Sequence, residues 1–172
     1  AADSGKTSLV ERLVHNTFKP GEATIGAAFS TLTIKDGEKI GIWDTAGQER
    51  YDALVPLYFR DASLVLIVVD ITSRFSLDGA KKWVEYLRIH HSNLPSMIVG
   101  TKIDLFEKRT VYTSDLELLG DQIVPSVQVS SKDSVNIDIL ISRLEDALSR
   151  EMNTPPSSPL YSPTKTNRCC MY

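Results

Sequence analysis

The beginning of the chain carries the residue types of a phosphate-binding loop. Gly5-Lys6-Thr7 stands directly before an apolar helical pattern and matches the second half of the motif G-x-x-x-x-G-K-[ST], without its first glycine. In this motif the backbone N–H groups at a helix N-terminus point at phosphates, the lysine neutralises them, and the hydroxyl binds magnesium. The same three residues can also simply begin a helix. The residues of the candidate loop are Ala2, Asp3, Ser4, Gly5, Lys6, Thr7 and Ser8.

An aspartate and a glycine further along the chain could serve the same phosphates. Asp44 stands at the end of a predicted strand, where its carboxylate can hold a magnesium ion through water. Gly47 follows it and has no side chain to keep its N–H away from a terminal phosphate. Taken alone, Asp44 and Gly47 indicate no more than a turn. They indicate a phosphate and magnesium site only together with the other groups.

A third group has the residue types that read a guanine base. A buried carboxylate at Asp104 accepts hydrogen bonds from the N1–H and the exocyclic amine of guanine, whereas N1 of adenine offers a lone pair. Lys102 would pack on one face of the ring and Lys132 on the other, although a lone lysine is usually solvated. The backbone N–H of Ser131 would meet the guanine carbonyl. The candidate base-binding residues are Thr101, Lys102, Asp104, Ser130, Ser131 and Lys132.

These groups need a framework that gathers the ends of several strands. Strand and helix patterns alternate along the chain, which predicts an α/β fold with a mostly parallel, doubly wound sheet and helices on both faces. The turn at Asp36-Gly37 predicts a hairpin that makes one edge antiparallel. Ligands in such sheets lie beyond the carboxyl ends of the strands. The predicted helices cover residues 5–15, 80–87 and 137–148, and the predicted strands 29–34, 39–43, 64–69, 97–99 and 127–129.

Composition and charge narrow the class of protein. The chain has 172 residues and a formal charge of -3, which argues against a general nucleic-acid binder. The longest apolar run, residues 64–69, is too short to cross a bilayer. The two cysteines, Cys169 and Cys170, are adjacent and cannot staple a core, so we expect a reducing, intracellular environment.

With these groups in chain order, the sequence resembles a Ras-superfamily small GTPase of the Rab family over nearly its whole length. The segments TIGAAF over residues 24–29 and WDTAGQERY over 43–51 carry the resemblance, and the first is similar to the switch of the early-endosomal branch. The resemblance implies a P-loop small G domain that binds GTP and GDP with Mg²⁺. It also implies that Thr7, Thr24 and Asp44 hold the magnesium and that Thr24 contacts the γ phosphate as well. Phe18 would pack on guanine, and Gln48 would position the attacking water.

The same resemblance implies a molecular switch that regulates vesicle traffic. GTP and water would give GDP and phosphate, slowly unless an activating protein assists. Phe29, Trp43 and Tyr58 match the aromatic triad that meets effectors. The implied partners are an exchange factor, a GTPase-activating protein, a GDP-dissociation inhibitor, a Rab escort protein and effectors. We expect the protein to be a monomer and to bind no nucleic acid.

The chain divides into a G domain over residues 1–152 and a Pro/Ser-rich tail over 153–172, which we expect to be disordered. Cys169 and Cys170 resemble the double-cysteine Rab terminus, where two geranylgeranyl groups anchor the protein firmly. A pair of unmodified thiols is the simpler alternative. The resemblance therefore implies the cytoplasmic face of endomembranes, the early endosome above all, and the cytosol when a GDP-dissociation inhibitor is bound.

Three departures from the family pattern qualify this interpretation. The first motif glycine and the central strand that precedes it are missing, so we expect an N-terminally incomplete chain whose neighbouring strands would leave costly unpaired backbone groups. Asp3 would repel phosphates unless it points outward, and Thr101 stands where many relatives carry asparagine. A non-cycling GTP-binding scaffold or an inactive truncated GTPase remains an alternative. An ATP-using P-loop enzyme is disfavoured by Asp104.

Overall fold

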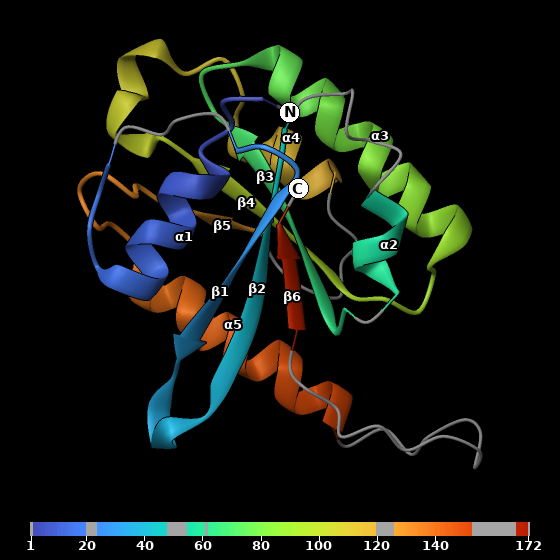
Figure 1. Ribbon diagram of the computed structural model, residues 1–172. Helices are drawn as coiled ribbons and strands as arrows, with labels where there is room; N and C mark the ends of the chain where they lie inside the picture. Colours follow the sequence, from blue (N-terminus) through green and yellow to red (C-terminus); the bar gives the residue numbers. More distant parts are fainter. Residues whose placement is uncertain are drawn as a thin grey trace.

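The structure is a computed structural model that describes residues 2–19, 24–47, 55–60, 62–119, 126–152 and 168–171 (Figure 1). The described strands form one sheet in the order β1-β2-β6-β3-β4-β5. Apart from the antiparallel pair β1–β2, the neighbouring strands run parallel, as the sequence predicts. The strands are β1 (Ala27–Thr33), β2 (Lys39–Thr45), β3 (Leu64–Asp70), β4 (Ser96–Thr101), β5 (Val127–Gln128) and β6 (Arg168–Met171).

Helices pack on both faces of this sheet. Among the described helices, none is long and apolar enough to cross a membrane. Within the described residues, two short 3-10 segments, η1 (Lys35–Gly37) and η3 (Ile103–Lys108), lie in the connections. The α-helices are α1 (Lys6–His15), α2 (Val55–Phe59), α3 (Arg74–His90), α4 (Thr113–Leu119) and α5 (Ile137–Met152).

The antiparallel edge is the hairpin predicted at Asp36-Gly37. Ala27 lies opposite Thr45 at its open end, and Thr33 lies opposite Lys39 next to the turn. The turn itself is the 3-10 segment η1, which needs Gly37 because the backbone there has φ +77°, a value that side chains disfavour. The edge hairpin therefore carries Asp44 toward the end of β2, where the sequence analysis expects it.

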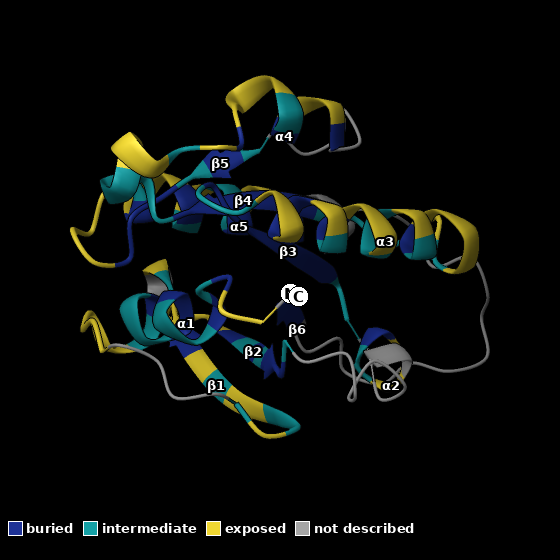
Figure 2. Cartoon of the chain, turned by 90° about the horizontal axis from the view of Figure 1, so that it is seen from above, coloured by how far each residue is buried: buried dark blue, intermediate teal, exposed yellow. Residues whose placement is uncertain are grey.

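β3 shows why the sheet is buried on both faces. All of its residues are buried, and their side chains alternate between two apolar clusters. Leu64, Leu66 and Val68 pack with residues of α1 and α5, whereas Val65, Ile67 and Val69 pack with residues of α3 and α4. In Figure 2 the central strands are dark blue, while α3 presents exposed residues on its outer side. The wholly apolar run 64–69 predicts this arrangement correctly.

The strand β6 is the largest difference from the sequence-based expectation. Arg168–Met171 lies parallel to β2 and β3 and fills the central position between them (Figure 1). Cys169 pairs with Ile42 on one side and with Leu64 on the other. The prediction of a disordered tail is therefore wrong for residues 168–171, while 153–167 lie outside the described residues. The physical reason is that β2 and β3 each have an inner edge whose backbone groups need partners. A short apolar strand between them supplies these partners and packs against the apolar clusters on both faces.

The sheet core supplies a direct stability prediction. We expect Ile67→Ala to lower the free energy of unfolding by about 2–5 kcal/mol, because Ile67 is fully buried and its loss leaves a cavity. Ile89→Ala on the exposed side of α3 is the matched control, with an expected change within about 0.5 kcal/mol. Urea unfolding followed by circular dichroism measures both. Equal losses in the two variants would contradict this assignment of the core.

Candidate functional site

The candidate phosphate loop has the backbone shape that its sequence predicts. Gly5 precedes α1 with φ +88°, a conformation that a side chain would strain. A Cβ at this position would also lie 3.5 Å from Thr101 Oγ1. No acidic residue occupies the first turn of α1, and no side chain caps its N-terminus. The N-terminus of α1 thus carries no negative side chain in its first turn, as suits a helix end that binds an anion.

Thr101 joins this loop to the central sheet. Its hydroxyl donates to the carbonyl oxygen of Ser4 at 2.6 Å and lies 3.2 Å from that of Val69. Thr101 and Ser4 are both buried, so these polar contacts are protected from water. The threonine that departs from the family pattern thus holds the loop by a direct side-chain bond between the end of β4 and Ser4.

Lys102 makes a second connection between the same two segments. Its Nζ donates to the carbonyl oxygen of Asp3 at 2.7 Å and forms an ion pair with Asp70 Oδ2 at 2.8 Å. The Asp3 side chain is 97% exposed, and its carboxylate lies 3.6 Å from Lys102 Nζ. Asp3 therefore points outward, which removes the main objection to phosphate binding. Asp70 holds the lysine in place, a role that the sequence does not assign to it.

Thr7, Thr24 and Asp44 come together from three separate segments. The Thr7 hydroxyl lies 2.7 Å from Asp44 Oδ2 and 2.8 Å from the Thr24 hydroxyl. Thr24 Oγ1 lies 3.4 Å from the same carboxylate oxygen. The segments that the sequence analysis assigns to magnesium are thus adjacent in space. We call these three residues the hydroxyl–carboxylate cluster.

The electrostatics of this cluster suit a cation. Asp44 Oδ1 is buried without a hydrogen-bond partner among the described residues. Burial raises the pKa of Asp44, while the Thr7 hydrogen bond and the nearby Lys6 charge act in the opposite direction. Nowhere in the described segments do three or more His, Cys, Asp or Glu side chains gather as a metal site. One carboxylate with hydroxyls fits Mg²⁺, which is usually held by few carboxylates together with phosphates.

Lys6 lies buried beside the cluster. Burial lowers the pKa of Lys6 to about 8, although the carboxylates of Asp44 and Asp3 favour its charged form. Its Nζ donates to Ser4 Oγ at 3.2 Å within the loop. A buried ammonium of this kind is stabilised when a phosphate binds. Burial deprives the charge of solvating water, and the phosphate supplies an opposite charge in its place.

At the opposite end of the site, Ser130 holds Asp104. The Ser130 hydroxyl donates to Asp104 Oδ1 at 2.7 Å and accepts the backbone N–H of Asp133 at 3.0 Å. This places the candidate guanine-reading carboxylate against the loop that follows β5. The structure therefore brings the two predicted base-binding segments, 101–104 and 130–132, into contact.

Arg12 is a positioning residue that the sequence analysis missed. From α1 its Nε donates to the carbonyl oxygen of Ser131 at 2.7 Å, and its Nη2 to that of Lys132 at 3.1 Å. The first helix thus fixes the loop that would face the guanine carbonyl. An arginine on an amphipathic helix has no sequence signal for such a contact, because its partners lie more than a hundred residues away.

The three predicted effector aromatics also lie together. The ring centroids of Phe29 and Trp43 are 5.1 Å apart, and those of Trp43 and Tyr58 are 5.4 Å apart. Phe29 is 53% exposed, so the group reaches the surface. β1, β2 and α2 each supply one ring. The role of this group in effector binding stays a prediction.

The remaining predicted residues are placed differently. Phe18 is 40% exposed beyond α1, and Gly47 is partly buried just after β2. Gln48, the predicted catalytic residue, lies outside the described residues. Cys169 and Cys170 are fully buried in β6, so in this arrangement neither thiol is accessible for lipidation. Their lipidation stays a prediction that requires β6 to lie elsewhere.

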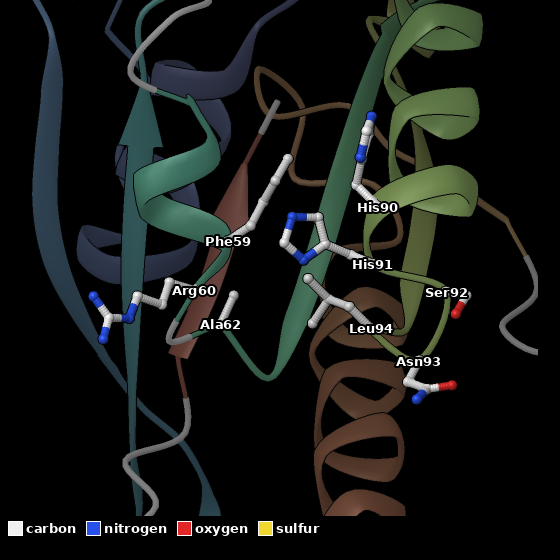
Figure 3. Close-up of a pocket in the computed structure, with 8 residues that line it drawn as sticks. All are labelled: Phe59, Arg60, Ala62, His90, His91, Ser92, Asn93 and Leu94. Carbon is white, nitrogen blue, oxygen red and sulfur yellow. The ribbon is translucent and has the colours of Figure 1, made fainter.

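A pocket of about 350 Å³ lies apart from all these groups, between the segment after α2 and the end of α3 (Figure 3). The ring of His91 packs against Phe59 with centroids 5.4 Å apart. Figure 3 shows that Arg60 and Asn93 point away from this ring. The polar side chains do not converge, so the pocket does not form a second site.

The buried lysine gives the candidate site a pH signature. Between about pH 8 and pH 10.5 the unfolded chain keeps a proton on Lys6 that the folded chain has lost, so rising pH stabilises the fold. Lys6→Met removes this contribution. We therefore expect the stability of the ligand-free parent to rise relative to Lys6→Met over this range, by a few kcal/mol at most. Urea midpoints at pH 7, 8, 9 and 10 measure the difference.

The control for this experiment is Lys82→Met, because Lys82 is exposed on α3. The thiols are common to all three proteins, so their ionisation cancels in the comparison. A difference between parent and Lys6→Met that stays constant with pH would show that folding does not lower the pKa of Lys6.

Comparison with known proteins agrees with this geometry. The model of the Ras family matches residues 1–150. Human Ras-related protein Rab-22A is 36% identical over 177 residues, covering 96% of this chain and 91% of the human protein. RABF2a of Arabidopsis thaliana and Rab5 of Nicotiana tabacum are 39% and 40% identical, each covering 86% of this chain and 76% of the relative. The chain therefore belongs to the Ras family and, within it, to the Rab proteins.

Proposed function

We propose that this chain is a Rab-like GTPase, a switch that binds GTP and GDP and hydrolyses GTP slowly. The observation that carries this proposal is the meeting of three predicted groups at one edge of the sheet. The phosphate loop, the hydroxyl–carboxylate cluster and the Asp104–Ser130 pair all lie beyond the carboxyl ends of strands. Small GTPases of the Ras family are GTP hydrolases, so family membership and geometry point to the same activity.

The hydroxyl–carboxylate cluster would hold Mg²⁺. Thr7 and Thr24 supply hydroxyl oxygens, and Asp44 supplies the carboxylate with its unpartnered oxygen. The ion, when bound, neutralises the charge that develops on the phosphates. The hydrogen bond between the hydroxyls of Thr7 and Thr24 links the segment that contains Thr24 to the site. We expect this contact to change when the γ phosphate is lost.

The chain's own residues would orient and neutralise the phosphates. The N–H groups that begin α1 would bind the phosphates, and Gly5 supplies the positive φ with which the loop enters the helix. Lys6 gains a stabilising partner for its buried charge when a polyphosphate binds. Because its pKa then rises, binding near pH 9 takes up a proton.

Guanine selectivity would depend on Asp104. Ser130 occupies one of its carboxylate oxygens and sets the orientation of the group. The Lys102 stem would cover the ring, and Arg12 fixes the loop at Ser131 from behind. These contacts favour a base with two donors on its edge, which is guanine and not adenine.

As a switch, the protein would act through regulators and effectors. The aromatic group Phe29–Trp43–Tyr58, in which Phe29 is exposed and the other two rings are half-buried, would offer effectors an apolar surface. We further propose an exchange factor, an activating protein, a GDP-dissociation inhibitor and a Rab escort protein as partners, and traffic at the early endosome as the process. Geranylgeranyl groups on Cys169 and Cys170 would supply the membrane anchor.

A substitution at Asp104 tests the base assignment. We expect Asp104→Asn to weaken GTP binding by about 100-fold or more, because the charge is lost and one of the two acceptor oxygens becomes an NH2 group that faces a donor of guanine. Asp138→Asn on the exposed side of α5 is the matched control and leaves binding unchanged. Titration of both variants and the parent with fluorescent GTP and ATP measures the effect. ATP binding by the parent as tight as GTP binding would refute guanine selectivity.

A substitution at Gln48 tests the switch cycle. We expect Gln48→Leu to slow GTP hydrolysis by about 10- to 100-fold, because leucine cannot orient the attacking water. GTP affinity should stay at the parent value, which serves as the internal control. Single-turnover phosphate release measures the rate. A parent that binds GTP stoichiometrically but never hydrolyses it would support the non-cycling scaffold, and an unchanged rate in Gln48→Leu would remove Gln48 from the mechanism.

A further inference from the structure

Arg12 bridges two segments of the candidate site. From α1 its Nε donates to the carbonyl oxygen of Ser131 at 2.7 Å, and its Nη2 donates to that of Lys132 at 3.1 Å. Its Nη1 donates to the carbonyl oxygen of Asn16 at 2.8 Å and lies 3.1 Å from Asn16 Oδ1. All three nitrogens of the guanidinium are therefore engaged, two with the loop after β5 and one with the end of α1.

The end of α1 is a firm anchor for this guanidinium. Asn16 caps the helix in the left-handed conformation with φ +52°, which asparagine tolerates better than most residues. Its backbone N–H donates back to the carbonyl oxygen of Arg12 at 3.1 Å. Since the guanidinium is planar and its donors form a rigid fork, holding one nitrogen at Asn16 fixes where the other two point. Arg12 thus fixes the loop relative to the helix whose N-terminus follows the phosphate loop.

Ser130 holds the same loop where it leaves β5. The backbone of Ser130 pairs with that of Val135 through two hydrogen bonds of 3.1 Å, and its hydroxyl donates to Asp104 at 2.7 Å. Arg12 holds the carbonyls of the two residues that follow. The contribution of Arg12 to the loop is therefore separate from that of Ser130, and a substitution can remove it alone.

The contact with Ser131 also decides which way the donors of the loop point. The Ser131 carbonyl and the Lys132 N–H belong to one planar trans peptide group, so they point in opposite directions. Because Arg12 holds the carbonyl toward α1, this N–H is directed away from α1. The neighbouring N–H of Ser131 is the group expected to meet the guanine carbonyl. Without Arg12, the peptide group between these two residues would be free to rotate.

We propose that Arg12 determines base specificity by aiming the backbone N–H groups of residues 131–132 at the 6-carbonyl oxygen of guanine. This inference rests on the proposed function, because the site must bind a guanine nucleotide for it to hold. Arg12 is a positioning residue, since it acts through the loop and not on the base. Adenine carries an amino group at the same position, which offers these N–H groups no acceptor. Arg12 thus adds a second means of selection to that of Asp104, which reads the N1–H and the exocyclic amine.

A nucleotide that differs from GTP only at the 6-position tests this inference. In 6-thio-GTP the carbonyl oxygen is replaced by sulfur, a weak acceptor, while the N1–H and the exocyclic amine remain. We expect Arg12→Met, which keeps the length of the side chain and removes its donors, to weaken GTP binding about tenfold. The affinity for 6-thio-GTP should change by no more than about twofold. Competition with fluorescent GTP on the full chain with Mg²⁺ at pH 7 measures both affinities.

The comparison separates base reading from a general loosening of the protein. Equal losses of affinity for GTP and 6-thio-GTP in Arg12→Met would overturn the inference, because a loosened site loses both nucleotides alike. A parent that binds GTP and 6-thio-GTP equally well would overturn it too, since the 6-position would then not be read. ITP keeps the 6-carbonyl oxygen and lacks the exocyclic amine, so Arg12→Met should weaken ITP binding by the same factor as GTP binding.

Two further variants complete the experiment. Arg88→Met on the exposed side of α3 is the matched control and leaves all three affinities unchanged. Arg12→Lys keeps the charge, but a single ammonium cannot span the carbonyls that the guanidinium fork reaches. We expect it to weaken GTP and ITP binding about three- to fivefold, with 6-thio-GTP binding unchanged. If Arg12→Met fails to fold, Arg12→Lys decides the question, and equal affinities in Arg12→Lys and parent, or equal losses for the three nucleotides, would overturn the inference.

The parent protein keeps this inference apart from the proposed function. A folded parent that binds none of the three nucleotides would refute the proposed function, and the inference with it. A parent that binds GTP and prefers it to 6-thio-GTP, with Arg12→Met unchanged in both affinities, would leave the proposed function standing. That result would remove Arg12 from base recognition.

Discussion

The fold depends on filling one position in the middle of its sheet. β2 and β3 each present an inner edge of backbone N–H and C=O groups, and burying these without partners would cost far more than any single contact in the site provides. Arg168–Met171 meets both edges at once, and Cys169 and Met171 pack in one core while Cys170 packs in the other. With that position filled, β2 and β3 belong to one continuous sheet, whose carboxyl ends carry Asp44 and Asp70.

The site is held together by bonds between its parts rather than by any one motif. Thr101 and Lys102 bind the phosphate loop from the end of β4. Arg12 binds the base loop from the helix that the phosphate loop begins. The phosphate loop and the base loop are therefore fixed by polar contacts to backbone carbonyls, whereas Thr7 meets Asp44 and Ser130 meets Asp104 through their side chains. Such contacts preserve geometry even where a side chain departs from the family pattern, as Thr101 does.

Sequence patterns predicted the elements whose periodicity is strong. The apolar run 64–69 indicated β3, and the stripe through Leu140 and Leu144 indicated α5. Spacing also named candidate residues that the structure brings together, such as Thr7 with Asp44 and Asp104 with Ser130, while their roles stay predictions. Contacts such as Thr101–Ser4 and Arg12–Ser131 could not be predicted, since they depend on the distance between segments far apart in sequence. The strand β6 was missed because Pro- and Ser-rich surroundings favour disorder and a cysteine pair resembles a lipid attachment site.

The position of β6 also has a kinetic meaning for folding. The hydrogen bond between Thr45 and Met171 joins residues 126 positions apart, and the paired residues of β2 and β6 are similarly distant along the chain. Contacts of such high sequence separation form late and slowly, because the entropy of closing the loop must be lost before the pairing rewards it. The nucleotide-site halves on β2 and on β3–β4 would therefore form as separate pieces first. Their joining through β6 would be the step that sets the rate of reaching the native sheet.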